Sequence, residues 1–156
     1  MELRACPMTK ELAEDILCWE YPPPYDLYNN EYTEDALKEL MENLYEAILD
    51  GNGTLTGFYC LGDAAIVPAG ITLGLYREPA VDIGIGMNPA LTGKGNRKIF
   101  FSFILDVVMK TFLRTAFRLT AAAFNERAIK LYMNAGFQKA DVFNHDGETF
   151  IIMLKY

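Results

Sequence analysis

The sequence predicts one domain of the α/β (mixed α+β) class, and three observations support this prediction. The 156 residues are 51% hydrophobic and 22% charged, a balance typical of one globular domain. A chain of this length buries about two-thirds of its unfolded surface and needs no disulfide or metal to fold. Segments with helical periodicity alternate with apolar runs of strand length. We therefore expect a single domain over residues 1–156, built on a mixed sheet with helices.

The N-terminal part of the chain predicts a strand and two helices joined by a stiff loop. Residues 2–6 form the strand, and Thr9 caps a helix that ends near Trp19. The consecutive prolines 22–24 prevent that helix from continuing and fix an extended backbone. Thr33 and the two acids after it then begin a short second helix.

A β-hairpin is predicted next. Two apolar runs, 44–49 and 54–61, flank the turn 50–53, whose residues tolerate positive φ. The alternative is that the preceding helix continues through the first run. Residues 62–79 are rich in loop formers and predict one strand fragment near 71–75.

Residues 81–87 have the periodicity of a strand. Valine, isoleucine and methionine alternate there with Asp82, Gly84 and Gly86, so one face is almost without side chains. We expect another group to approach that face closely. A long helix from Gly93 or Lys94 to about Leu113 follows, because apolar residues recur at helical spacing.

The C-terminal part predicts a strand, a helix and a hairpin. The strand covers residues 117–123. Asn125 caps the helix, and Gly136 ends it in the left-handed conformation. Two runs, 137–143 and 149–156, then form the closing hairpin.

Charge is distributed unevenly along the chain. The net charge is −7, but residues 1–82 hold 16 acids and 4 bases, whereas residues 83–124 hold one acid and six bases. An acidic protein is not expected to bind nucleic acid, because phosphate contacts need a basic surface. The middle cluster indicates an anionic ligand, with a solvated surface as the alternative. Its bases are Lys94, Arg97, Lys98, Lys110, Arg114 and Arg118.

Cysteine usage and hydropathy bear on location. The chain has three cysteines, and no two of them form a CxxC motif. We therefore expect reduced thiols in a cytoplasmic protein and no metal site. The cysteines are Cys6, Cys18 and Cys60. No apolar run reaches the roughly 20 residues of a membrane helix, so no membrane partner is expected.

Residues 87–98 place a glycine-rich turn between a strand and a helix. Helix N-terminal amides, glycines and the helix dipole together suit a phosphate or pyrophosphate, with an ordinary turn as the alternative. A Walker loop is excluded, because Asn88 and Gly95 stand where it needs glycine and serine or threonine. A dinucleotide fingerprint from Gly84 is excluded by Pro89 at its third small position.

The helix that Asn125 caps carries a second motif, which consists of Asn125, Ala128, Tyr132, Gly136 and Phe137. Together, this motif and the glycine-rich turn resemble the GNAT superfamily of acyl-CoA-dependent N-acetyltransferases. The resemblance covers most of the chain and is strongest over 81–137. The family turn reads Arg or Gln, two residues, Gly, one residue, Gly or Ala. Here the central Gly95 and a Gly-Lys-Gly core match, whereas Thr92 and Arg97 depart at the two ends.

The resemblance implies a GNAT-like fold with a twisted, mostly antiparallel sheet of about six to seven strands and about four helices. It implies acetyl-CoA as co-substrate and direct transfer of the acetyl group to a primary amine, without an acyl-enzyme. Met87 would donate its backbone N–H to the thioester oxygen, and Tyr132 would act as general acid to the coenzyme A thiolate. The implied coenzyme-binding residues are Ile85, Gly86, Met87, Thr92, Gly93, Lys94, Gly95, Asn96, Arg97, Asn125 and Tyr132.

The general base and the acceptor site stay open. Asp82 and Glu20 are candidates for the base, a structural role for Asp82 is the alternative, and some family members have no dedicated base. By the resemblance, residues 19–32 would line the acceptor site. Its aromatic rings and acids suit a cationic small-molecule or peptide amine, or else pack as a lid. The candidate rings are Trp19, Tyr21, Tyr25 and Tyr28.

Three other functions compete with this hypothesis. A longer acyl donor would use the space beside Gly84 and Gly86. A catalytically weak or inactive coenzyme A-binding sensor or interaction module is suggested by the departures at Thr92 and Arg97. A nucleotide-binding domain would require ATP to compete for the turn. The resemblance leaves a homodimer open.

Overall fold

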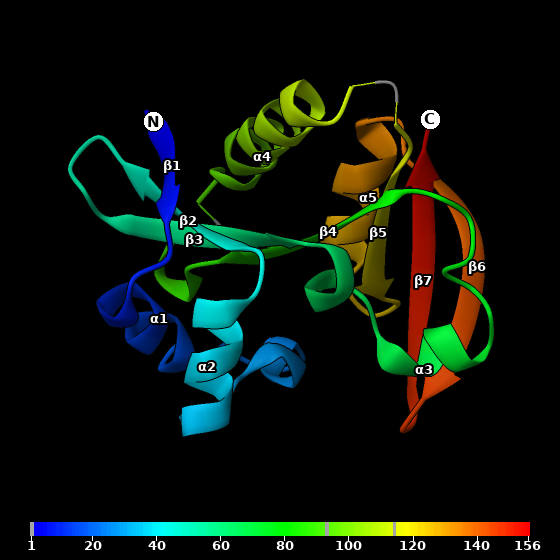
Figure 1. Cartoon of the computed structure of the whole chain (residues 1–156), viewed down its shortest axis with the longest axis horizontal. Helices are drawn as coiled ribbons and strands as arrows, with labels where there is room; N and C mark the ends of the chain where they lie inside the picture. The colour runs from blue at the N-terminus through cyan, green and yellow to red at the C-terminus, as the bar shows by residue number, and fades with distance from the viewer. Residues whose placement is uncertain (1, 93, 114) are drawn as a thin grey trace. The chain divides into compact units, whose positions relative to one another are not determined.

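A computed structural model describes residues 2–92, 94–113 and 115–156 of the chain (Figure 1). Strands, α-helices and short 3-10 helices (η) follow one another along these residues. Their bounds are β1 Leu3–Pro7, α1 Lys10–Leu17, η1 Tyr25–Tyr28, α2 Glu34–Glu42, β2 Tyr45–Asp50, β3 Leu55–Leu61, η2 Gly62–Ala65, α3 Pro68–Thr72, β4 Val81–Met87, η3 Pro89–Leu91, α4 Arg97–Thr111, β5 Phe117–Ala122, α5 Glu126–Asn134, β6 Gln138–His145 and β7 Glu148–Lys155.

The strands form a mixed, mostly antiparallel sheet. Their order is β1-β2-β3-β4-β5-β7-β6 in a 7-stranded sheet. Strands β4 and β5 are parallel, with Val81 beside Phe117, whereas β1–β2, β2–β3, β5–β7 and β6–β7 are antiparallel. The predicted fold class and strand number are confirmed, and so are both predicted hairpins.

The chain divides into two compact units, and β4 contributes to both. The first unit contains Met1–Cys60 and Ile85–Thr111, and the second contains Leu61–Gly84 and Phe112–Tyr156. The last residues of β4, the glycine turn and α4 therefore belong to the first unit. The first residues of β4, with β5, α5 and the closing hairpin, belong to the second.

In the first unit, α4 covers one face of the sheet and α1 and α2 cover the other (Figure 1). Both predicted caps are confirmed, because the Thr9 hydroxyl accepts from Leu12 N at 3.2 Å and the Thr33 hydroxyl from Ala36 N at 3.0 Å. These caps satisfy backbone donors that the helices cannot satisfy themselves. The core beneath α1 and α2 consists of Ala13, Ile16, Leu17, Leu40, Ala47 and Leu55.

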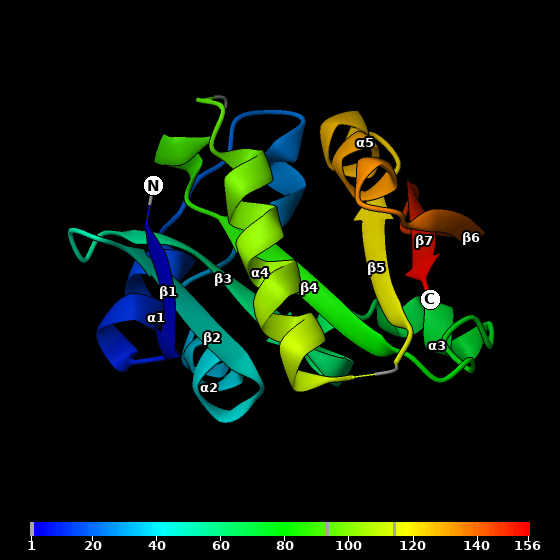
Figure 2. The same cartoon turned by 90° about the horizontal axis from the view of Figure 1, so that it is seen from above.

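In the second unit, α5 lies at the C-terminal end of β5 (Figure 2). Asn125 caps α5 as predicted, its Oδ1 accepting from Ala128 N at 3.3 Å. Gly136 follows α5 with a φ of +101°, also as predicted. The closing hairpin turns at Asp146 and Gly147, whose φ values of 50° and 79° suit a tight turn between twisted strands.

Two predicted elements are wrong in type or position. The predicted strand fragment at 71–75 overlaps the end of α3, whose first residue, Pro68, has a ring-fixed φ that suits a helix start. Helix α4 begins at Arg97, because Gly95 has a φ of +77° and cannot lie in a right-handed helix. The predicted start at Gly93 lies outside the described residues. None of the described helices is long and apolar enough to cross a membrane.

Candidate active site

The end of β4 turns the backbone of Met87 away from the neighbouring strand β3. Asn88 donates its N–H to Thr56 O of β3 at 2.9 Å. In a strand, the N–H and C=O of one residue point to the same side, and successive residues alternate. The polar backbone groups of Met87 therefore point away from β3. Its carbonyl accepts a hydrogen bond from the Tyr21 hydroxyl at 2.6 Å.

Asn88 fixes the start of the glycine turn. Its side-chain amide donates to Leu55 O at 3.0 Å, and its Oδ1 accepts from Ala90 N at 3.0 Å. The Thr92 hydroxyl then donates to Pro89 O at 2.9 Å. These bonds hold the chain that leads from β4 toward α4.

The residues before α4 form a turn that suits an anion. Gly95 has a left-handed φ, and a Cβ added there would meet no atom within 4 Å. Phe100 donates its N–H to Asn96 O at 3.0 Å. The N–H groups of residues 97–99 therefore lie before the first such bond and point out of the helix end. These N–H groups, the exposed Lys94 and the half-buried Arg97 together provide positive charge that complements a phosphate. Gly93 lies outside the described residues.

The aromatic segment 19–32 packs against its own unit at several points. The Tyr21 N–H donates to Asn29 Oδ1 at 2.7 Å, and the rings of Tyr21 and Tyr28 meet edge to face at 6.4 Å. The Tyr32 hydroxyl donates to Glu14 at 2.7 Å. Tyr25 is half-buried at the start of η1, and Tyr28 is 38% exposed. The packed arrangement favours the lid interpretation, and the acceptor role of these rings stays a prediction.

Burial changes the chemistry of the Tyr21 hydroxyl. Its pKa is raised to about 12, first by burial and second by the neighbouring Tyr28. The hydroxyl is therefore neutral at physiological pH and remains a hydrogen-bond donor to Met87 O.

Gly86 makes room for a side chain of the protein. A Cβ at Gly86 would lie 2.2 Å from Phe58, and a Cβ at Gly57 would lie 2.4 Å from Gly86 O. Phe58 in turn stacks on Trp19 with ring centroids 6.1 Å apart. Phe58 is thus the group that approaches the predicted bare face of the strand at Gly86. Its ring also fills the space at Gly86 that the alternative of a longer acyl donor would use.

In the second unit, Tyr132 lies on α5, the helix that Asn125 caps at its N-terminus. Tyr132 is half-buried, and its ring centroid lies 6.4 Å from that of Phe137. Asn125 supplies its side-chain oxygen to the cap of α5. The roles of Asn125 and Tyr132 toward a coenzyme stay predictions.

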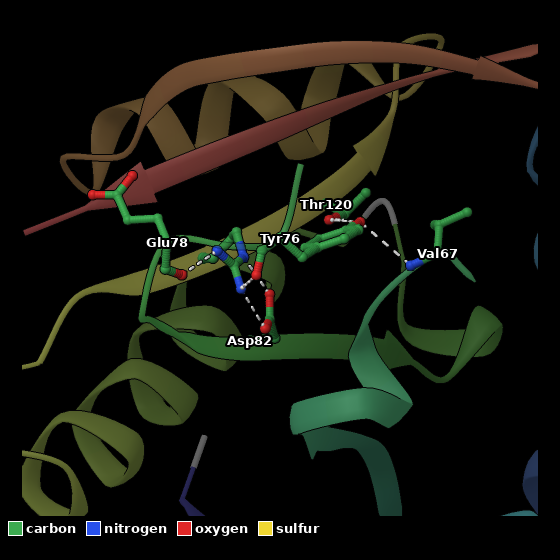
Figure 3. Close-up of polar contacts among 6 residues, drawn as sticks. Val67, Tyr76, Glu78, Asp82 and Thr120 are labelled. Carbon is green, nitrogen blue, oxygen red and sulfur yellow. Dashed lines mark hydrogen bonds and ion pairs between the residues drawn. The ribbon is translucent and has the colours of Figure 1, made fainter. Parts of the chain in front are cut away.

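Asp82 is held by Arg118 within the second unit. Figure 3 shows Asp82 with Tyr76 and Glu78, which surround the same guanidinium. The Arg118 Nε donates to Asp82 Oδ1 at 2.6 Å and its Nη2 donates to Oδ2 at 2.8 Å. The guanidinium also donates to Glu78 O at 2.8 Å and lies 5.0 Å from the centroid of the Tyr76 ring. The bonds to Asp82 raise the pKa of Arg118. Both carboxylate oxygens are engaged, which favours the structural role for Asp82 over that of the base.

The same contact corrects the interpretation of the basic cluster. Arg118 is buried and neutralises Asp82, so it is not part of a surface for anions. Lys110 pairs with Asp106 at 3.1 Å on the exposed side of α4. Lys94 and Arg97 lie at the turn itself, and Arg114 lies outside the described residues.

The remaining reactive side chains form no second centre in the described part of the chain. His145 contacts Asp146 at 3.1 Å in the closing hairpin, where both side chains are exposed. Cys6, Cys18 and Cys60 are thiols. Among the described residues, no cluster of histidine, cysteine and carboxylate side chains could hold a metal ion.

Solved structures of N-acetyltransferases share this fold. The spermidine/spermine N-acetyltransferase SpeG from Vibrio cholerae, solved with manganese ions, is 18% identical, with a TM-score of 0.67 over 99% of this chain and 92% of that one. A candidate phosphinothricin N-acetyltransferase is 16% identical, with a TM-score of 0.72 over 99% and 98% of the two chains. A candidate acetyltransferase from Acinetobacter baylyi is 14% identical, with a TM-score of 0.62 over 98% and 92%.

No protein-family model and no curated protein sequence matches the chain. The structural likeness spans nearly the whole chain, and at these identities it defines the fold. The chain therefore has the fold of the GNAT N-acetyltransferases, as the sequence motifs predicted.

Several contacts of the site region were not predicted from the sequence. Phe58 and Arg118 make long-range contacts, to Gly86 and Asp82, that no local pattern marks. Asn88 carried a detectable signal, because an asparagine before proline often begins a turn by bonding to the backbone two residues on.

Proposed function

We propose that the protein is an acetyl-CoA-dependent N-acetyltransferase that acts on a primary amine of a small, cationic acceptor. The observation that carries the proposal is the arrangement at the end of β4. There Met87 directs its backbone N–H and C=O away from β3. The open turn at Gly95 follows and leads into the N-terminus of α4. Structures of this fold that are named as N-acetyltransferases support acetyl transfer as the reaction class.

The residues present suit the coenzyme. Gly95 leaves open space where a pyrophosphate would lie, and Lys94 and Arg97 supply positive charge beside the helix amides. The implied binding residues are Ile85, Gly86 and Met87 for the pantetheine arm, Thr92, Gly93, Lys94, Gly95, Asn96 and Arg97 for the pyrophosphate, and Asn125 beside the pantetheine. Along β4, Ile85 and Met87 direct their polar backbone groups away from β3, whereas those of Gly86 face β3 and leave its contribution to be steric.

Each proposed catalytic group has a defined task. Acetyl-CoA, when bound, supplies the acetyl group as a thioester. The Met87 N–H stabilises negative charge on the thioester oxygen, and the Tyr132 hydroxyl gives its proton to the leaving sulfur. The amine nitrogen gains the acetyl carbon and loses one proton. Because Arg118 engages both oxygens of Asp82, that proton passes to solvent water or to the second candidate base, Glu20, and solvent water then restores the proton of Tyr132.

The acidic N-terminal region supports a cationic acceptor. Residues 1–82 hold 16 acids and 4 bases, and the aromatic segment 19–32 carries three of these acids. Faces of aromatic rings and carboxylates both attract ammonium groups. The cysteine thiols further support a cytoplasmic location.

Calorimetric titration with acetyl-CoA and coenzyme A, followed by a thiol-release screen over primary amines, tests the proposal. We expect micromolar binding and thiol release that depends on an amine. Binding without release from any amine would favour the alternative of a coenzyme A-binding sensor. No binding would overturn the proposal.

A matched pair of glycine variants locates the site. Gly95 and Gly53 both have left-handed φ values, +77° and +81°, and a Cβ added at either residue would meet no atom within 4 Å. Gly95→Ala and Gly53→Ala should therefore lose similar stability, about 1 kcal/mol each. Only Gly95→Ala should weaken coenzyme A binding, by about tenfold. Equal affinities for the two variants would place the coenzyme elsewhere.

A further inference from the structure

The proton of the Tyr21 hydroxyl has a fixed destination. A carbonyl oxygen can only accept, so the 2.6 Å contact between Tyr21 Oη and Met87 O requires the hydroxyl to donate. Because its only proton is used in this bond, Tyr21 Oη can interact with further groups only as a hydrogen-bond acceptor. Among the described residues, none donates a hydrogen bond to it. Any further polar partner of Tyr21 Oη must therefore be a donor.

The position of this oxygen matters for the proposed reaction. The C=O and N–H of Met87 point to the same side of β4, away from β3. Tyr21 Oη, bonded to that carbonyl, stands at the same strand edge as the N–H proposed to bind the thioester oxygen. The proposed binding of the thioester oxygen to that N–H would bring the acyl carbon, and with it the attacking nucleophile, to this edge.

Tyr21 is held at its backbone, its ring and its hydroxyl. Its backbone N–H is bonded to Asn29 and its ring packs against Tyr28, so the whole segment fixes the direction of the hydroxyl. Pre-organised polar groups orient a ligand better than mobile ones, because less conformational entropy is lost on binding.

From this geometry we propose that Tyr21 is the residue that orients the acceptor amine, by accepting one of its N–H hydrogens at the Met87 edge. The inference rests on the proposed function and extends it to specificity. A primary amine can give one N–H to Tyr21 Oη and still direct its nitrogen lone pair at the acyl carbon. A group without a hydrogen on its reacting atom would meet the Tyr21 lone pairs and be repelled.

Tyr21→Phe tests the inference, because it keeps the ring and removes the one hydroxyl. Steady-state kinetics would use acetyl-CoA and the fastest amine among spermidine, lysine, an aminoglycoside and a tetrapeptide with a free N-terminus. We expect the KM for the amine to rise about tenfold, with the affinity for acetyl-CoA unchanged within twofold. Tyr156→Phe is the matched control, since it removes a tyrosine hydroxyl bonded to Glu78 on the exposed surface of the second unit.

The outcomes separate this inference from the proposed function. If the wild-type protein transfers acetyl groups and Tyr21→Phe keeps the wild-type KM for the amine, the inference alone is wrong. A weaker affinity of Tyr21→Phe for acetyl-CoA, with the amine KM unchanged, would show that the hydroxyl only shapes the strand edge. If the wild-type protein transfers to none of the four amines, the proposed function fails first and this inference fails with it.

Discussion

Arg118 and Asp82 form a two-bond ion pair inside the second unit. Their side chains are only 4% and 13% exposed. The pair joins neighbouring parallel strands, since Asp82 of β4 lies beside Arg118 of β5 in the register. The further bond to Glu78 O ties the segment before β4 to the same guanidinium. A buried pair with these additional bonds is costly to break at one side, because the remaining charge loses its partner.

We expect Arg118→Met to lower the free energy of unfolding by about 3 kcal/mol or more, because it leaves the Asp82 carboxylate buried without its cation. The double variant Arg118→Met/Asp82→Leu should recover part of this loss, since no charge is then left unpaired. Urea unfolding of both variants measures the difference. A single variant as stable as the wild type would show that the pair contributes little.

The Asp82→Asn variant tests the base hypothesis directly. Both oxygens of Asp82 already accept hydrogen bonds from Arg118, so we expect turnover per folded protein to keep its pH dependence. The measurement is a pH profile of thiol release, taken well below the unfolding temperature of the variant. A lost or displaced acid limb would instead support Asp82 as the base.

Gly86→Ala is expected to destabilise the first unit through overpacking. A Cβ there would lie 2.2 Å from the Phe58 ring, so strand or ring must shift at a cost of about 1–3 kcal/mol. Phe58→Leu should relieve part of that cost in the double variant. Gly51→Ala is the control, because its Cβ would meet the nearest atom at 3.5 Å, an ordinary contact. Thermal unfolding of the four proteins checks the prediction, and equal losses for Gly86→Ala and Gly51→Ala would contradict it.

Alkaline pH should remove the stabilisation that Tyr21 provides. Burial raises its pKa from 10.0 to about 12, so the unfolded chain loses this proton at lower pH than the folded protein does. The stabilisation is therefore complete below pH 10 and is lost as the pH rises toward 12. The stability difference between wild type and Tyr21→Phe should shift by about 1 kcal/mol against the wild type between pH 9 and pH 11. Urea unfolding at both pH values measures it. A constant difference would mean that the hydroxyl is not buried in solution.

Helix ends and hairpins were predictable from the sequence, because short stretches of neighbouring residues determine them. Thr9, Thr33 and Asn125 cap helices because their side chains reach backbone donors within the next turn. Gly136 ends α5 because glycine adopts positive φ without steric cost. The hairpins follow equally from apolar runs that flank turn residues. These features depend on neighbours in sequence, which a single chain displays directly.

The features that depend on long-range packing were not predictable in the same way. The sequence shows that residues 81–87 alternate with glycines, but not that Phe58 fills the space at Gly86. It shows six bases in one segment, but not that Arg118 is buried against Asp82. The start of α4 was misplaced because Lys94 and Gly95 fit a helical pattern until the φ of Gly95 is known. In each case the deciding contact or angle is set by tertiary structure.

Tyr132→Phe tests the proposed general acid on α5. A phenylalanine keeps the ring packing against Phe137 and removes the proton that the leaving sulfur would receive. We expect turnover to fall about 10²-fold, which is the usual contribution of general acid catalysis, while the affinity for coenzyme A changes less than threefold. The control is Tyr156→Phe, whose side chain is 82% exposed and should leave both quantities unchanged. Steady-state kinetics and calorimetry on the same preparations give the two numbers. Equal losses of turnover and affinity would show that Tyr132 binds the coenzyme without supplying the proton, and the thiolate would then have to be protonated by solvent.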